Sequence, residues 1–121
     1  MVEIVSFSTG GPGVQVALTG GEDLIVNGDV ELYSTDDHII TTNGDSRIVI
    51  GPNATLVGLA PEIFNPAIKL GQISSGGLGG NDDVTIASGA SVIAERFGIE
   101  SNHDENTITN HGSILAGAVA I

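Results

Sequence analysis

Short runs of alternating apolar and polar residues recur along the whole chain, separated by glycine, asparagine and aspartate. Such alternation predicts half-buried β-strands, and the intervening residues tolerate the positive φ angles of tight corners. One stretch predicts three successive strands, Leu24–Val26, Val30–Tyr33 and His38–Thr42, with corners at Asn27-Gly28 and Asp36-Asp37. The pattern therefore predicts an all-β fold.

Four segments share the order of polar opening, apolar run, glycine or asparagine corner and second apolar run. They begin at Asp23, Ser46, Asp83 and Asn106, which are 23, 37 and 23 residues apart. A unit of this length supplies three short strands and buries its apolar face only by stacking on its neighbours. We therefore predict a single domain over residues 1–121, a right-handed parallel β-solenoid of about five coils. A β-sandwich also has short strands and turns, but it does not explain the recurrence.

The long middle interval indicates an insertion in one coil, a loop over residues 59–75. Its apolar side chains include Ile63, Phe64, Ile68 and Leu70. One interpretation is a surface loop tolerated on a repeat scaffold. The other is a docking loop, because these are many apolar groups for a loop.

The composition narrows the range of functions. The 121 residues include 15 acidic and three basic side chains, with a formal net charge of −12. Such a chain does not bind nucleic acid or anionic lipid by charge, and no apolar run reaches membrane-spanning length. There is no cysteine or tryptophan, and only three phenylalanines and one tyrosine. Aliphatic side chains must therefore fill the interior.

Acidic residues gather at the corner that opens each repeat. If the coils stack in register, these groups lie about 4.8 Å apart and repel by about 3 kcal/mol per pair at an effective dielectric near 20. Calcium, a hard cation that takes six to eight oxygen ligands, would neutralise them. We predict a Ca²⁺ site with ligands from Gly79, Asn81, Asp82, Asp83, Asp23, Asp45 and Asp104.

A glycine-rich segment supports this prediction. Gly76–Thr85 reads Gly-Gly-Leu-Gly-Gly-Asn-Asp-Asp-Val-Thr and resembles the Gly-Gly-x-Gly-x-Asp nonapeptide of RTX-type calcium-binding solenoids. The resemblance implies that turn carbonyls and an aspartate hold the ion. Asn81 stands where the family has aspartate, and Asp82 follows one place later. The alternative is a flexible glycine corner with solvated acids.

The repeat sequence itself has relatives in architecture. Ile108–Gly117 resembles the Asn-x-Gly-x-Ile coils of bacterial haemagglutinin-like and autotransporter passenger domains. That resemblance implies an extracellular or cell-surface protein whose solenoid is a rod for display or adhesion.

Catalytic motifs are not apparent. Solenoid polysaccharide lyases and hydrolases combine carboxylates with basic and aromatic groups, of which this chain has few. His38, His103 and His111 lack metalloprotease spacing and are interpreted as solvated turn residues. We predict a non-catalytic structural protein. The alternative is a small adhesive or carbohydrate-binding module that recognises a cell-surface glycan through residues 59–75.

Both ends of the sequence suggest self-association. Residues 1–22 predict a degenerate first coil that opens with a strand, and the chain closes in an apolar run with no charge after Glu105. Unpaired strand edges recruit other chains, and a contact between unlike surfaces propagates. We therefore predict a head-to-tail homopolymer that forms a fibre, layer or adhesin stalk. The predicted contact residues are Val2, Ile4, Phe7, Leu115, Val119 and Ile121.

Overall fold

The computed structural model describes residues 2–60, 66–71, 80–101 and 105–121. These residues form strands and no helix, and every pairing between strands is parallel. Sheet A contains β1 (Val2–Val5), β4 (Asp23–Val26), β7 (Arg47–Ile50), β10 (Asp83–Ile86) and β13 (Thr107–Asn110). Sheet B contains β2 (Thr9–Gly11), β5 (Glu31–Ser34), β8 (Thr55–Gly58), β11 (Ser91–Ala94) and β14 (Ser113–Ala116). Sheet C contains β3 (Val16–Ala17), β6 (Ile40–Thr41), β9 (Ile68–Leu70) and β12 (Ile99–Ser101).

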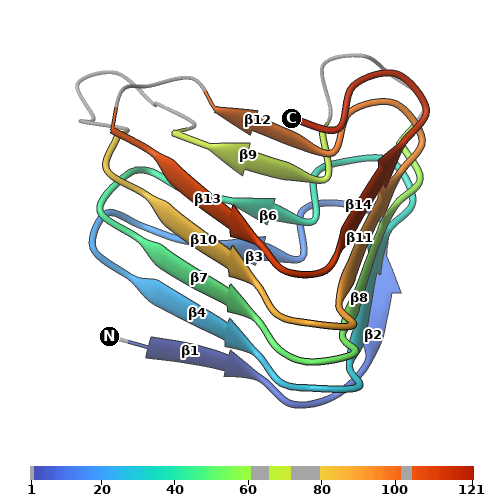
Figure 1. Cartoon of the computed structure of the whole chain (residues 1–121), viewed down its shortest axis with the longest axis horizontal. Helices are drawn as coiled ribbons and strands as arrows, with labels where there is room; N and C mark the ends of the chain where they lie inside the picture. Colours follow the sequence, from blue (N-terminus) through green and yellow to red (C-terminus); the bar gives the residue numbers. More distant parts are fainter. Residues whose placement is uncertain (1, 61–65, 72–79, 102–104) are drawn as a thin grey trace.

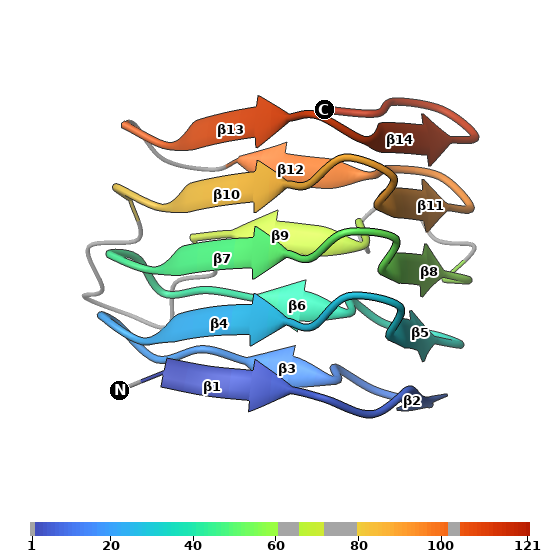
Figure 2. The same ribbon diagram turned by 60° about the horizontal axis from the view of Figure 1, so that its bottom comes forward.

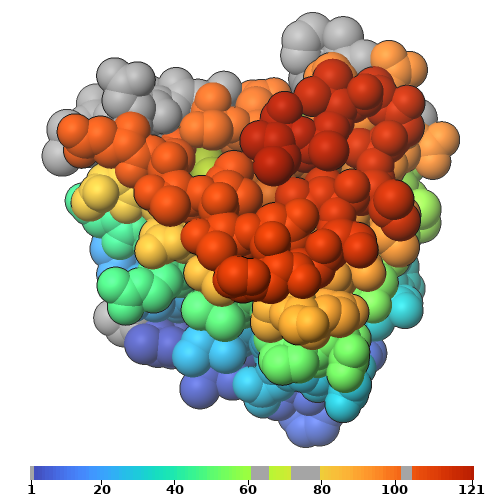
Figure 3. Space-filling model, viewed as in Figure 1, coloured from blue at the N-terminus to red at the C-terminus, as the bar shows by residue number. Residues whose placement is uncertain are grey.

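The chain visits sheets A, B and C in turn, and each visit adds one strand to a stack. Figure 1 shows the three sheets as the sides of a triangular coil. In Figure 2 the chain runs rightwards along sheet A at the front and returns along sheet C behind while it rises, which is a right-handed coil. Four complete coils precede a fifth, which includes β13 and β14 and lies at the front in Figure 3. The predicted parallel β-solenoid is confirmed.

The register of the strands corrects the predicted repeat. Leu24 lies beside Ile48, a spacing of 24 residues that also separates β10 from β13, whereas β11 and β14 are 22 residues apart. The predicted alignment of Asp23 with Ser46 is therefore wrong by one residue, because Arg47 holds the position in line with Asp23. The burial of the apolar rows decides the register, since a slip of one residue would turn every inward side chain outwards.

Equivalent inward side chains stack into aliphatic ladders that fill the interior. Leu24, Ile48 and Val84 are fully buried in sheet A, as are Leu32 and Leu56 in sheet B. Burying one such side chain contributes about 1.5–3 kcal/mol relative to its exposure. Among the described residues, every buried side-chain nitrogen or oxygen has a hydrogen-bond partner. The ladders explain how a chain with few aromatic residues forms a core.

The corners also stack on one another. Between sheets C and A, Asp45, Asn81 and Glu105 have φ angles of 54°, 63° and 67°, in line with Gly21 at 80°. Their backbones are joined from coil to coil, as where the Asp45 N–H donates to the Gly80 carbonyl at 2.9 Å. Left-handed residues therefore recur at equivalent positions of this bend. At the two corners that the sequence predicted, the positive φ lies at Asp29, one residue after Gly28, and neither Asp36 nor Asp37 has one.

The predicted insertion loop is wrong as a single loop. Strand β9 lies within residues 59–75, and both Ile68 and Leu70 are fully buried in sheet C. Ile68, Lys69 and Leu70 alternate between apolar and polar side chains as the other strands do. Strand β9 pairs with β6, and Ile68 stacks on Ile40 in the core. The extra length falls before and after β9. Residues 61–65, with Ile63 and Phe64, and residues 72–79 lie outside the described ranges.

Candidate functional site

A polar pocket of about 230 Å³ lies at the corner that leads from sheet C into sheet A. Four of the seven predicted calcium ligands line it, because the register brings the openings of three consecutive coils together. Of the other three, Asp82 lies buried beside the pocket, and Gly79 and Asp104 lie outside the described residues. The lining consists of Asp23, Asp45, Ser46, Arg47, Asn81 and Asp83.

Arg47 changes the electrostatics expected of this corner. It occupies the outward position between Asp23 and Asp83 on adjacent strands, where the sequence alignment had predicted a continuous column of acids. Its backbone N–H also donates to Asp23 Oδ1 at 2.9 Å. The outward positions therefore alternate between acidic and basic side chains, and the bond to Asp23 comes from the Arg47 backbone.

The carboxylate oxygens at the corner already accept hydrogen bonds from the protein. Asn81 Nδ2 donates to Asp45 Oδ1 at 3.0 Å, in addition to the bond between Arg47 and Asp23. Across the described ranges, no three His, Cys, Asp or Glu side chains are grouped so that they could hold a metal ion. These bonds and the positive charge of Arg47 would compete with a calcium ion for the carboxylates, and calcium binding at this corner is not tested by the structure.

Asp82 joins four consecutive coils at the same corner. Its side chain is only 1% exposed; Oδ2 accepts the Thr42 hydroxyl at 2.6 Å, and Oδ1 accepts the Ser46 N–H at 3.0 Å. Its own N–H donates to Asn106 Oδ1 at 2.8 Å, and Thr42 Oγ1 accepts the Gly71 N–H at 2.8 Å. The sequence analysis assigned Asp82 as a calcium ligand and did not predict these hydrogen bonds within the protein. The sequence does contain one indication of this buried site: Thr42 is a polar residue at an inward position of sheet C, where it needs a hydrogen-bond partner.

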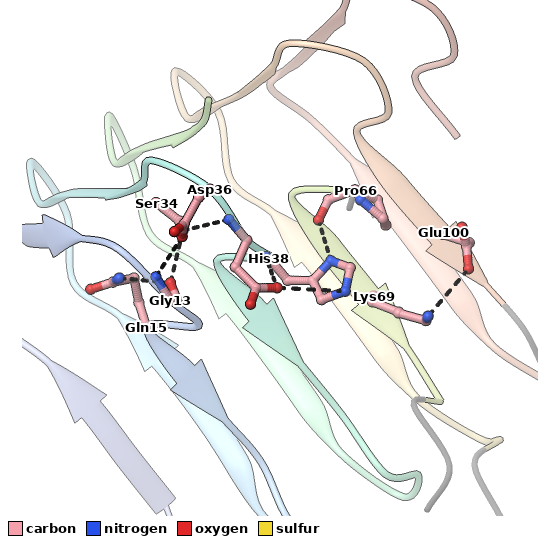
Figure 4. A network of polar contacts seen from close by, with 9 residues as sticks. Gly13, Gln15, Ser34, Asp36, His38, Pro66, Lys69 and Glu100 are labelled. Atoms are coloured by element: carbon pink, nitrogen blue, oxygen red, sulfur yellow. Dashed lines mark hydrogen bonds and ion pairs between the residues drawn. The ribbon is translucent and has the colours of Figure 1, made fainter. Parts of the chain in front are cut away.

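A second polar network lies at the corner between sheets B and C (Figure 4). The Gly13 N–H donates to Asp36 Oδ1 at 2.8 Å, and the Ser34 hydroxyl donates to the Gly13 carbonyl at 2.7 Å. His38 is 5% exposed, and its Nδ1 lies 2.8 Å from the Pro66 carbonyl. Since a carbonyl only accepts, Nδ1 carries the hydrogen. The interpretation of His38 as a solvated turn residue is wrong, because its ring bridges two coils.

An apolar pocket of about 300 Å³ lies beside β12, between residues of the fourth and fifth coils. Val119 pairs with Phe97, and the Ile99 N–H donates to the Ala120 carbonyl at 2.9 Å. This pairing places Ile121 in line with Ile99, at the next inward position of sheet C. The lining consists of Phe97, Ile99, Glu100, Ser101, Val119 and Ile121.

The six predicted assembly residues are exposed, but they do not share one surface. Val2 and Ile4 lie in line with Asp23 and Ile25 on the outer side of sheet A. Leu115 lies on the outer side of sheet B, whereas two of the six line the apolar pocket. Their exposed fractions are Val2 53%, Ile4 58%, Phe7 83%, Leu115 60%, Val119 49% and Ile121 61%.

Within the described part of the chain, no helix is long and apolar enough to cross a membrane. No protein-family model, curated protein or solved structure matches this sequence. The geometry described above therefore carries the functional proposal.

Proposed function

We propose that this chain is a non-catalytic structural subunit of an extracellular or cell-surface protein, in which the solenoid is a rigid scaffold. One observation carries the proposal. Sheets A and B keep their register through five coils, although the chain between β8 and β10 includes the additional length around β9. Each coil packs on its neighbours through continuous ladders, which is the arrangement of a stiff, extendable rod.

The two pockets support a role without catalysis. In the polar pocket, two carboxylates accept hydrogen bonds, Asp23 from the Arg47 N–H and Asp45 from the Asn81 side chain. The apolar pocket is lined mainly by aliphatic and aromatic groups. Neither lining contains a histidine, the residue that most often acts as a general acid or base. His38 instead holds the Pro66 carbonyl in a buried corner.

The extracellular location is supported by sequence. Ile108–Gly117 resembles the coils of exported passenger domains, and a net charge of −12 keeps scaffold subunits soluble and apart from unrelated anionic surfaces. Calcium binding at the polar pocket stays a prediction, with Arg47 as the competing source of positive charge. The alternative of a glycan-binding loop over residues 59–75 loses part of its basis, because β9 is buried within that range.

Fractionation of cells that produce the protein tests the proposal. Surface proteolysis of intact cells and immunolabelling should find the native chain outside the cell or on its surface. Recovery from the cytosol alone would contradict the proposal. Turnover of a polysaccharide by the purified protein would contradict the non-catalytic assignment independently of location.

A further inference from the structure

The corner between β7 and β8 carries the tripeptide Asn53-Ala54-Thr55, in which a threonine follows an asparagine by two residues. This Asn-x-Thr pattern, with any residue but proline in the middle, is the acceptor sequence for N-linked glycans on the surface loops of secreted proteins. The other asparagines of the chain have no serine or threonine at that spacing. Whether the pattern is an acceptor site depends on its place in the fold.

The acceptor sequence lies at the surface of the third coil. Asn53 is exposed, and Thr55 is half-buried on the outer side of sheet B. Ala54, between them, is fully buried and donates its N–H to the Gly51 carbonyl at 3.1 Å. The turn is therefore anchored at Ala54, and the two residues that define the acceptor sequence lie next to solvent on either side of the anchor.

The Asn53 carboxamide is not used by the protein itself. Among the described residues, no hydrogen bond is found to this side chain. Asparagines at other corners differ, since Asn27 Nδ2 donates to Ser6 Oγ and Asn81 Nδ2 donates to Asp45 Oδ1, both at 3.0 Å. The nitrogen to which a sugar is joined in an N-linked glycan is therefore free to react in Asn53.

The neighbouring coils leave room for the Asn53 side chain. Extended by two residues, the pairing of β8 with β5 and β11 places Asp29 and Gly89 in line with Asn53. All three have left-handed φ angles, 64° for Asp29, 61° for Asn53 and 80° for Gly89. A Cβ on Gly89 would collide with Asn53 Oδ1, so the glycine of the fourth coil admits the carboxamide. The corner lies midway along the stack (Figure 2), so a group attached there projects from its side.

We propose that Asn53 is an N-linked glycosylation site. This inference rests on the proposed extracellular location, because the modification is typical of secreted proteins. Asn53 Nδ2 attacks the anomeric carbon of a sugar that is activated by a phosphate or pyrophosphate group. A C–N bond forms, the bond from the anomeric carbon to the phosphate oxygen breaks, and Nδ2 releases one proton to the transferase. The phosphate-bearing carrier is the leaving group, and no oxidant or reductant is needed.

Mass spectrometry of the chain recovered from the cells that produce it tests the site. Trypsin cleaves after Arg47 and Lys69 and releases residues 48–69, in which only Asn53 begins an acceptor sequence. We expect this peptide to carry the additional mass of one or more sugar residues, with fragment ions that place the mass on Asn53. A peptide without this mass would overturn the proposal.

Three variants separate the acceptor sequence from the shape of the corner. Thr55→Val keeps a β-branched side chain but removes the hydroxyl, so it should lose the glycan, whereas Thr55→Ser should keep it. Asn53→Gly keeps the left-handed corner, as Gly89 does in the next coil, and should lose the glycan without loss of fold. Circular dichroism checks the fold of all three. A glycan that persists in Thr55→Val would show that the acceptor sequence is not recognised, and would overturn the proposal.

The place of recovery distinguishes this inference from the scaffold function. A chain found outside the cell with Asn53 unmodified overturns the glycosylation site and leaves the proposed location intact. A chain found only in the cytosol contradicts the location, and the mass of its peptide then decides the site separately.

Discussion

The first and fifth coils hold equivalent places in sheets A and B, yet their inward rows differ. In sheet A the first coil places Glu3 where the fifth places Ile108, and in sheet B it places Thr9 where the fifth places Ile114. The backbone pairing is the same kind of parallel ladder in both. The difference shows that the same backbone pairing carries inward side chains of opposite polarity. We expect a further layer to pack more readily on the apolar row than on the charged one.

The same comparison holds for the two acidic residues before β10. Asp82 is buried and accepts hydrogen bonds from two coils, whereas Asp83 lies on the outer side of sheet A beside Arg47. One is part of the scaffold, and the other belongs to its surface. Two adjacent aspartates therefore have different roles: the side chain that points inwards links coils, and the side chain that points outwards forms part of the surface.

The largest expected loss of stability comes from a carboxylate introduced into an inward row in the middle of the stack. Ile48→Glu places a carboxylate at the position equivalent to Glu3 but between two aliphatic neighbours. We expect a loss of roughly 4 kcal/mol or more in the free energy of unfolding, because a buried carboxyl lacks partners there. Urea titration measures it. Val49→Glu, one residue on and facing outwards, is the control; a similar loss in both would show that direction does not matter.

The next effect distinguishes the two aspartates. Asp82 Oδ1 accepts the Ser46 N–H, and its Oδ2 accepts the Thr42 hydroxyl. An asparagine would replace one of these acceptors with an N–H₂, and the Thr42 hydroxyl, which already accepts the Gly71 N–H, would have to accept this group too. Asp82→Asn should lower the free energy of unfolding by about 1–3 kcal/mol. Asp83→Asn should change it by less than about 0.5 kcal/mol. Equal stability of both variants would contradict the structural role of Asp82.

A smaller effect concerns Arg47 and calcium. Arg47→Gln leaves Asp23, Asp45 and Asp83 around the polar pocket without their cation. Thermal melts should then show a calcium-specific stabilisation of about 1 kcal/mol, larger than in the native chain and above a sodium control of equal ionic strength. Arg96→Gln, outside this pocket, is the matched control. A native chain that responds to calcium as strongly as the variant would show that Arg47 does not replace the ion.

The smallest effect lies at the corner that leads out of the first coil. Glu22 Oε1 accepts the Thr19 hydroxyl at 2.6 Å and the Thr19 N–H at 2.8 Å, and these bonds lower the pKa of the Glu22 carboxyl. A lowered folded-state pKa gives stability that is present above the ordinary pKa of 4.5 and is lost as the pH falls through the folded value. Glu22→Gln should flatten this part of the pH–stability curve slightly. An unchanged curve would contradict it.

The sequence predicts the fold because its signal is repeated. The alternation around Leu24 and Ile48 specifies strands, and the recurrence specifies stacking, so the solenoid follows from pattern alone. The register does not, because polar corner residues such as Ser46 and Arg47 look equally suited to open a repeat. Only the packing of the inward rows decides between them. Strand β9 was not predicted for a similar reason, because the prolines before it and the glycines after it are typical of a loop.

The polar corner is predicted in composition but not in role. Asp23, Asp45 and Asp83 do meet there, as repetition implies. Arg47 lies between Asp23 and Asp83 because the true register differs by one residue from the predicted alignment of Asp23 with Ser46. That Asp82 points inwards depends on Thr42, which lies two coils away in the stack. Contacts of this kind between coils are invisible to a pattern read along the chain.

Sedimentation velocity of Glu3→Leu tests most directly whether the inward row controls stacking. The variant removes the single charge from the inward row of the first coil, and Glu31→Leu, on the outer side of sheet B, makes the same change where it should not matter. We predict that Glu3→Leu self-associates at lower concentration than the native chain and Glu31→Leu, because a second chain can pack on its apolar inward row. A Glu3→Leu variant that self-associates no more readily than the native chain would contradict the account.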